Sequence, residues 1–130
     1  RHLSRDDLRE LEEALDDIRN AWLDSRPSLI ERRVSRSAQI AVLLDGRYDY
    51  SLYADDYIEM TEDVIDEVHT LSFTWERVKL RTDGDYTAFG RHVFRDDYGF
   101  TQTVYVSYTL REAGHGFIIT EVGSSRTPLL

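Results

Sequence analysis

At 130 residues the chain has the length of one domain and can bury a hydrophobic core. Its hydrophobic fraction of 41% is ordinary for a globular protein, and no apolar run approaches the length of a membrane span. The formal net charge of −9 argues against nucleic-acid binding, which needs clustered Lys and Arg to neutralise phosphates. The basic cluster Arg32, Arg33 and Arg36 is short, and we interpret it as a solvated helix end.

The chain contains no cysteine, which excludes disulfides, thiol catalysis and zinc–thiolate sites. Because the sequence begins with Arg1 rather than Met, we expect that a leader was removed, either a signal peptide or a disordered segment. The localisation therefore stays open between the cytoplasm and, if a signal was removed, export.

The first predicted element is a helix that starts at Ser4. The Ser4 hydroxyl can cap the helix, and Asp6 and Asp7 follow in the first turn, where the helix dipole favours acids. Apolar residues then recur every three or four positions and form one stripe, namely Leu8, Leu11, Leu15, Ile18 and Trp22. The remaining surface is acidic, and it is either a partner-binding surface or a solvated helix back.

Two further helices and a hairpin are predicted before the middle of the chain. A short helix is expected over 27–35. Residues 39–44 and 47–53 are predicted strands joined by an Asp-Gly turn, a strong hairpin signal. A third helix is expected to start at Thr61 and to run to His69. It could also begin as early as Asp56, which would add Tyr57 and Met60 to its buried side.

The C-terminal half is predicted to be four strands joined by Gly-containing turns, over 70–81, 85–95, 100–111 and 117–122. In the first of them the alternation of apolar residues changes phase near Glu76 and Arg77, which predicts a β-bulge there. The residues after 122 carry no strand pattern and are expected to be loose. We divide the chain into a single domain over 1–125 and a loose tail over 126–130.

This order of helices, hairpin, helix and four-stranded meander resembles the nuclear transport factor 2-like superfamily, which includes SnoaL-like cyclases, ketosteroid isomerases and scytalone dehydratase. A strand ending in Leu-Arg is followed by Gly-Phe-Ile-Ile at 116–119, where the association-type members have Gly-Trp-x-Ile, and Ser125 stands at their closing Ser. These members often carry His after the Ile. The chain has Glu121 and Gly123 there, so it keeps a carboxylate and lacks the imidazoles.

The resemblance implies an α+β fold, a curved antiparallel sheet (a cone) of about six strands with three helices of the N-terminal half packed on its concave face. An opening between sheet and helices is the default place for a small apolar ligand. Many members pair through the outer sheet face. Phe89, Val93 and Tyr105 would lie on that face if His92 and Tyr108 lie on the core face, and we therefore expect a homodimer.

His92 and Glu121 are the candidate catalytic residues. His92 lies mid-strand beside small residues, and its proton equilibrium is near neutral pH. Glu121 is expected to point with Phe117 into an apolar surrounding, where it could act as a general base. The alternatives are a His92 that is hydrogen-bonded to a neighbour and a Glu121 that forms a salt bridge with Arg91 or Arg95.

Seven further residues are candidate ligand-binding residues: Tyr48, Tyr50, His69, Trp75, Tyr86, Tyr108 and Phe117. A tyrosine could donate a hydrogen bond to a developing oxyanion. His69 could equally be a helix-end group, and Trp75 a core residue. His2 and His115 are not expected to take part in a site. We expect no cofactor, and no metal, because the paired Asp residues fit turns and no His stands at ligand spacing.

Three functions remain open. The first is a non-catalytic domain that binds a small apolar ligand or a partner and dimerises through the sheet. The second is a cofactor-independent isomerase, dehydratase or cyclase that uses Glu121 and His92 for proton transfer. The third is an assembly module whose sheet face carries the function.

Overall fold

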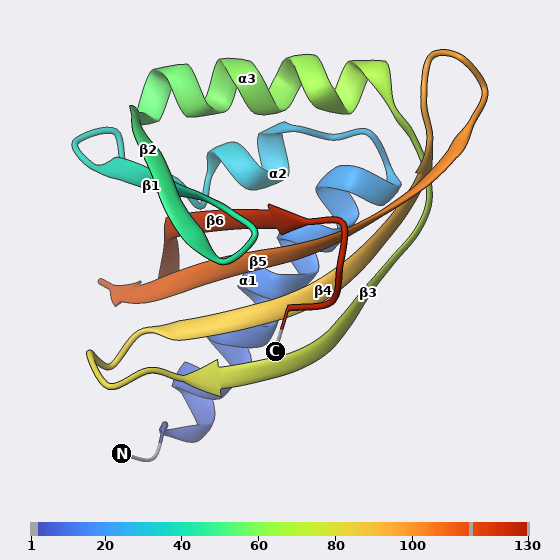
Figure 1. Ribbon diagram of the computed structural model, residues 1–130. Helices are drawn as coiled ribbons and strands as arrows, with labels where there is room; N and C mark the ends of the chain where they lie inside the picture. Colours follow the sequence, from blue (N-terminus) through green and yellow to red (C-terminus); the bar gives the residue numbers. More distant parts are fainter. Residues whose placement is uncertain (1–2, 115, 130) are drawn as a thin grey trace.

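The computed structural model describes residues 3–114 and 116–129, so His2 and His115 lie outside the described residues (Figure 1). Its elements in chain order are α1 (Arg5–Leu23), α2 (Ser28–Glu31), β1 (Gln39–Leu44), β2 (Arg47–Tyr53), α3 (Ala54–Glu67), β3 (His69–Leu80), β4 (Tyr86–Arg95), β5 (Thr101–Ala113) and β6 (Gly116–Ser125). None of the helices in the described part of the chain is long and apolar enough to cross a membrane.

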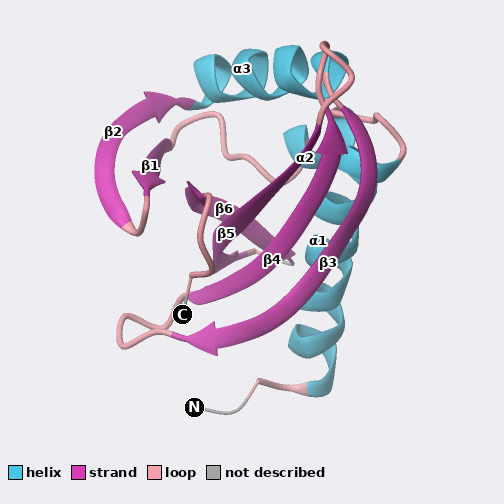
Figure 2. Ribbon diagram, turned by 45° about the vertical axis from the view of Figure 1, so that its right-hand side comes forward, coloured by secondary structure: helices cyan, strands magenta, loops and turns pink. Residues whose placement is uncertain are grey.

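One sheet of six strands, in the order β2-β1-β6-β5-β4-β3, forms the body of the molecule. The sheet bends around α1, and α3 lies across its upper end (Figures 1 and 2). The expected α+β cone is confirmed, with one correction. The sheet is mixed rather than wholly antiparallel, because β6 pairs in parallel with β1. The hairpin is thereby joined to the meander in a single sheet.

Helix α1 starts where the capping pattern places it, whereas α3 starts earlier than expected. The Ser4 hydroxyl accepts a hydrogen bond from the Asp7 backbone N–H at 3.0 Å. The α1 stripe is buried at Leu11, Leu15 and Ile18, whereas Leu8 is exposed. Helix α3 begins before the expected positions, at Ala54, and it buries a residue on each successive turn toward the sheet.

A charged group fastens α1 to α2. The Asp17 carboxylate accepts hydrogen bonds from Arg32 at 2.7 and 3.0 Å and from Arg33 at 2.8 Å. Burial alone would raise the pKa of Asp17, but the hydrogen bonds from Arg32 and Arg33 outweigh burial and lower it. The interpretation of this basic cluster as wholly solvated is therefore wrong for Arg33, whose side chain is 16% exposed. The Arg33 carbonyl also accepts a hydrogen bond from the Ile119 N–H at 2.7 Å, which ties α2 to β6.

The turn and the bulge that the sequence predicts are both present. Asp45 and Gly46 have φ angles of 52° and 80°, the two positive values that a tight hairpin turn of type I′ requires. The register between β3 and β4 shifts between Trp75 and Arg77, as the change of phase in the sequence predicts, and it shifts a second time near the start of β3.

A further bulge in β6 was not predicted. Thr109 pairs with Glu121 and Leu110 pairs with Ile119, so Thr120 has no partner on β5. Strand β6 also continues to Ser125, so the expectation that residues after 122 are loose is wrong for its last three residues. The extra residue reverses which side of the sheet Glu121 faces.

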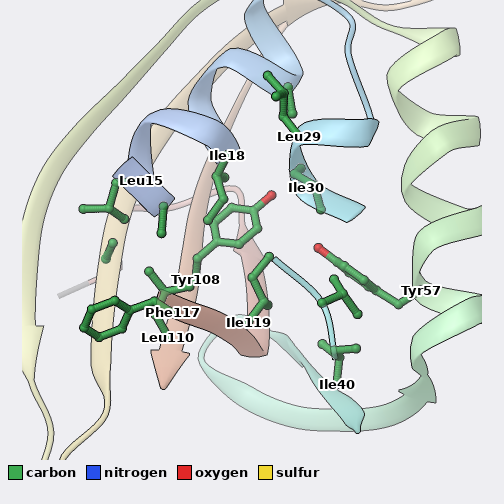
Figure 3. Close-up of a cluster of buried hydrophobic side chains, with 14 of the residues drawn as sticks. Leu15, Ile18, Leu29, Ile30, Ile40, Tyr57, Tyr108, Leu110, Phe117 and Ile119 are labelled. Atoms are coloured by element: carbon green, nitrogen blue, oxygen red, sulfur yellow. The ribbon is translucent and has the colours of Figure 1, made fainter. Parts of the chain in front are cut away.

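We call the concave side of the sheet, which faces the helices, the inner face, and the opposite side the outer face. The core lies on the inner face and contains Ile18, Ile30, Ile40, Leu110, Phe117 and Ile119, drawn in Figure 3. The Trp75 ring packs over Gly90, where an added Cβ would lie 3.1 Å from it, and its Nε1 donates a hydrogen bond to the Leu15 carbonyl at 3.0 Å. Trp75 therefore fixes α1 to the sheet.

A first prediction concerns Gly123, whose missing side chain leaves room for the Ser107 hydroxyl on the outer face. A Cβ at position 123 would overlap the Ser107 Oγ. We expect Gly123→Ala to lower the free energy of unfolding by about 1–3 kcal/mol, measured by urea denaturation. The control is Gly116→Ala, whose Cβ would meet only the flexible end of Arg33, at 3.4 Å.

We expect the control variant to keep its stability and the addition of Ser107→Ala to Gly123→Ala to restore most of the loss. An equal loss in Gly123→Ala and Gly116→Ala would contradict this account.

Candidate functional site

A cavity of about 310 Å³ lies between the inner face of the sheet and α3, and we call it the inner cavity. Most of its wall is apolar and comes from β1, α3, β4, β5 and β6: Val42, Met60, Val64, Val68, Phe94, Val104, Val106 and Val122. No Asp, Glu, Lys or Arg belongs to the described residues of this wall. The polar side chains of the wall are therefore uncharged groups and one histidine.

Two tyrosines and a tryptophan form the first polar group of the inner cavity. Trp22, at the end of α1, donates a hydrogen bond from Nε1 to the Tyr108 hydroxyl at 3.0 Å. Tyr57 lies on α3, and Figure 3 shows its hydroxyl end turned toward that of Tyr108. Burial raises the pKa of Tyr108 to about 12, and burial together with the nearby Tyr108 raises the pKa of Tyr57 well above its usual value. Both phenols keep their proton at neutral pH and can donate it to a ligand oxygen.

His92 is the second polar group. Its Nε2 and the Thr70 hydroxyl are 2.7 Å apart, and its ring centroid lies 4.8 Å from that of Trp22 and 4.9 Å from that of Phe94. Only 5% of the residue is exposed, and burial lowers its pKa to about 4. His92 is therefore neutral at physiological pH. Within the described residues its Nδ1 has no hydrogen-bond partner, which leaves that nitrogen for a ligand.

Glu121 does not join His92. Because of the bulge at Thr120, its side chain lies on the outer face, beside a second cavity of about 440 Å³ that we call the outer cavity. Its Oε2 accepts hydrogen bonds from Arg81 at 2.6 Å and from the Thr109 hydroxyl at 2.9 Å. The expected orientation beside Phe117 is thus wrong, and the salt-bridge alternative holds with a different arginine from the two considered.

The seven other candidates divide into three groups. Tyr50 and Tyr108 line the inner cavity. Tyr48 and His69 are exposed, and the Tyr48 hydroxyl lies 2.8 Å from that of Ser51. The last group packs in and against the core outside the inner-cavity wall, and consists of Trp75, Tyr86 and Phe117. The space that small residues leave beside His92 is filled by the Trp75 ring.

Sequence reasoning missed Trp22 and Tyr57 as lining residues. It placed Trp22 in the apolar stripe of α1 and Tyr57 on the buried side of an early-starting α3. The available signal was the helical spacing of Tyr57, Met60, Thr61 and Val64, which all line the cavity. Among residues 3–114 and 116–129, no three His, Asp or Glu side chains are grouped closely enough to hold a metal ion.

Comparison with known proteins gives matches in structure and none in sequence. No protein-family model matches the chain, and no curated protein sequence matches it. A ketosteroid isomerase-like protein from Erwinia carotovora atroseptica has 13% identity and a TM-score of 0.67, covering 94% of this chain and 97% of its own. An NTF-2-like protein of unknown function from Shewanella oneidensis has 14% identity and a TM-score of 0.66, covering 91% of this chain and 98% of its own.

A DUF4783 family protein from Bacteroides uniformis has 8% identity and a TM-score of 0.67, covering 88% of this chain and 97% of its own. At such identities these similarities show the fold alone. The chain has a nuclear transport factor 2-like fold, in agreement with the resemblance that its element order indicates.

A second prediction follows from the buried His92. Its pKa in the folded protein, about 4, lies below the ordinary value of 6.5, so between these values the unfolded chain binds more protons than the folded one. The low pKa of His92 therefore adds to the free energy of unfolding. This contribution is fully present above pH 6.5 and is lost as the pH falls toward 4. We expect it to amount to about 3 kcal/mol.

The measurement is urea unfolding at a series of pH values between about 7 and about 4.5, within this titration range. We expect His92→Gln to remove most of the dependence, while His69→Gln, at an exposed position, keeps it. A wild-type slope that survives in His92→Gln would assign the dependence to other groups.

Proposed function

We propose that this protein binds a small, neutral and mainly apolar ligand in the inner cavity, with one oxygen of the ligand held by the hydroxyls of Tyr57 and Tyr108. The observation that carries the proposal is the wall of the cavity. It is apolar over most of its area, contains no charged side chain among the described residues, and has uncharged hydrogen-bonding groups in one part.

The absence of charge in the wall selects the class of ligand. A buried carboxylate or ammonium group without a counter-charge costs several kcal/mol. A carbonyl or hydroxyl oxygen needs only a donor, and the two protonated phenols supply one. The neutral His92 adds a nitrogen that can donate or accept, because the hydroxyl of Thr70 can take either role toward the other nitrogen.

The alternative is an isomerase, dehydratase or cyclase that uses Glu121 and His92. The similarity to a ketosteroid isomerase-like fold favours considering it. The geometry supports it less well, because Glu121 lies on the other side of the sheet and is held by Arg81. His92, with a pKa of about 4, is a weak base at neutral pH. Ligand binding needs neither residue to move a proton, so we favour it.

A third prediction tests the class of ligand with three matched probes, 2-naphthol, naphthalene and 2-naphthoate, in calorimetric titrations. We expect 2-naphthol to bind more tightly than naphthalene, because its oxygen reaches the phenols, and 2-naphthoate to bind most weakly, because its charge has no partner. Tyr108→Phe should weaken 2-naphthol about five- to tenfold and leave naphthalene unchanged.

Control variants locate the binding. Val64 lines the cavity but is 38% exposed, so Val64→Trp can fill the space without unfolding the protein. Asp63→Trp adds the same side chain to an exposed neighbouring position outside the cavity wall. We expect only Val64→Trp to abolish binding. Preferred binding of 2-naphthoate, or equal binding by both tryptophan variants, would refute the proposal.

The proposal includes a homodimer formed through the outer face. Phe89, Val93 and Tyr105 point to this face, as expected from the inward direction of His92 and Tyr108. The same face carries four basic side chains, Arg77, Lys79, Arg91 and Arg95, which make no ion pair with any residue of 3–114 and 116–129. Two such faces in contact would bring like charges together, which weakens a dimer at low salt.

A fourth prediction follows for light scattering after size-exclusion chromatography. We expect the dimer fraction to rise between about 0.05 M and about 0.5 M salt, because salt screens the repulsion. Tyr105→Arg should abolish the dimer. The control is Tyr98→Arg, at a position that is 86% exposed in the turn after β4. A monomer under all conditions would rule out the dimer.

A further inference from the structure

The outer cavity differs in chemistry from the inner one. It lies on the other side of the sheet, and its wall includes the side chains of Lys79, Arg81, Ser107 and Glu121 as well as Phe89 and Leu129. Leu129, from the segment that follows β6, reaches the cavity because this segment crosses the outer face (Figure 1). The cavity therefore has both charged and apolar walls.

The charges of this wall do not cancel. Arg81 donates a hydrogen bond to Glu121 at 2.6 Å, so these two opposite charges form a pair. Lys79 makes no ion pair among the described residues, and it is the only lysine in a chain with 16 Lys and Arg residues. One positive charge is left over in the cavity wall, and it would suit a ligand with one negative charge.

The Ser107 hydroxyl adds a hydrogen-bond donor to the wall of the outer cavity. Ser107 is only 5% exposed and lines the outer cavity, and its hydroxyl has no hydrogen-bond partner within residues 3–114 and 116–129. The hydroxyl of Thr87, which also lines this cavity, does have a hydrogen-bond partner, because it lies 2.8 Å from the Thr109 hydroxyl. The Ser107 oxygen is not among the buried side-chain atoms that lack a partner in the described residues, so it is open to the cavity and can donate a hydrogen bond to a ligand oxygen there.

We infer that the outer cavity binds a small organic monoanion, a carboxylate with a hydrophobic body, whose carboxylate is held by Lys79 and the hydroxyl of Ser107. Phe89 and Leu129 would cover its apolar body. A ligand with one negative charge would neutralise the one positive charge left over in the wall, whereas a dianion would bring one negative charge without a counter-charge. This site is independent of the ligand of the inner cavity, whose wall selects against charge.

The single lysine makes the test specific. In protein labelled with ¹³C and ¹⁵N in lysine only, every side-chain signal belongs to Lys79. We expect octanoate to shift these signals until they saturate and 1-octanol, with the same body and no charge, to leave them in place. The titrations use the Val64→Trp variant with Tyr105→Arg added, so that neither binding in the inner cavity nor the proposed dimer contributes. Saturation by octanoate in that variant would support the outer site.

Calorimetry with octanoate then assigns the contacts. We expect Lys79→Gln to weaken binding about tenfold or more and Ser107→Ala about three- to tenfold. Arg91→Gln removes a charge from the same face but outside the cavity, and should leave the affinity unchanged. Equal losses in Lys79→Gln and Arg91→Gln would show a diffuse charge effect and overturn the proposal.

Three other results would also overturn it. They are an equal shift with 1-octanol, a response to inorganic phosphate as strong as that to octanoate, and a shift of the lysine signals that follows protein concentration instead of octanoate. Since Tyr105→Arg removes the proposed dimer, the last result would show that a second copy of the chain occupies the outer cavity itself.

Discussion

The chemistry of both cavities depends on one extra residue in β6. Successive side chains of a strand point to opposite faces of the sheet. A single unpaired residue therefore moves each side chain that follows it in the strand to the other face. Thr120 is that residue. Without it, Glu121 would face the inner cavity and add a negative charge to a wall that has none. With it, the carboxylate meets Arg81 and Thr109 on the outer face.

A second constraint holds the helical side in place. Asp17 on α1 binds Arg32 and Arg33, and the Arg33 backbone carbonyl binds the Ile119 N–H. An ion pair of this kind is destabilising to break, because the remaining charge is left partly buried without a partner. Trp75 adds a separate link from the sheet to the backbone of α1 at Leu15. These contacts position Trp22, and through it the hydroxyl of Tyr108.

Local patterns in the sequence were sufficient for most of the fold. The Ser4 cap, the Asp-Gly turn and the change of phase in β3 each depend on a few neighbouring residues, and each is present. The direction of His92 follows from the alternation in β4. The direction of Glu121 could not be obtained in the same way, because residues 117–122 do not alternate and give no phase. The parallel pairing of β1 with β6 and the partners of Asp17 are contacts between distant parts of the chain, which no local pattern contains.

The inner and outer cavities also share part of their walls. Leu43, on β1, lines both of them. Leu43 thus lies where the uncharged wall of the inner cavity meets the partly charged wall of the outer one. A substitution at this position would change the walls of both cavities, so selection on one binding activity would alter the other. Val64, by contrast, lines the inner cavity and not the outer one, and Lys79 lines the outer cavity and not the inner one. Substitutions at these two positions can therefore change each cavity independently in evolution.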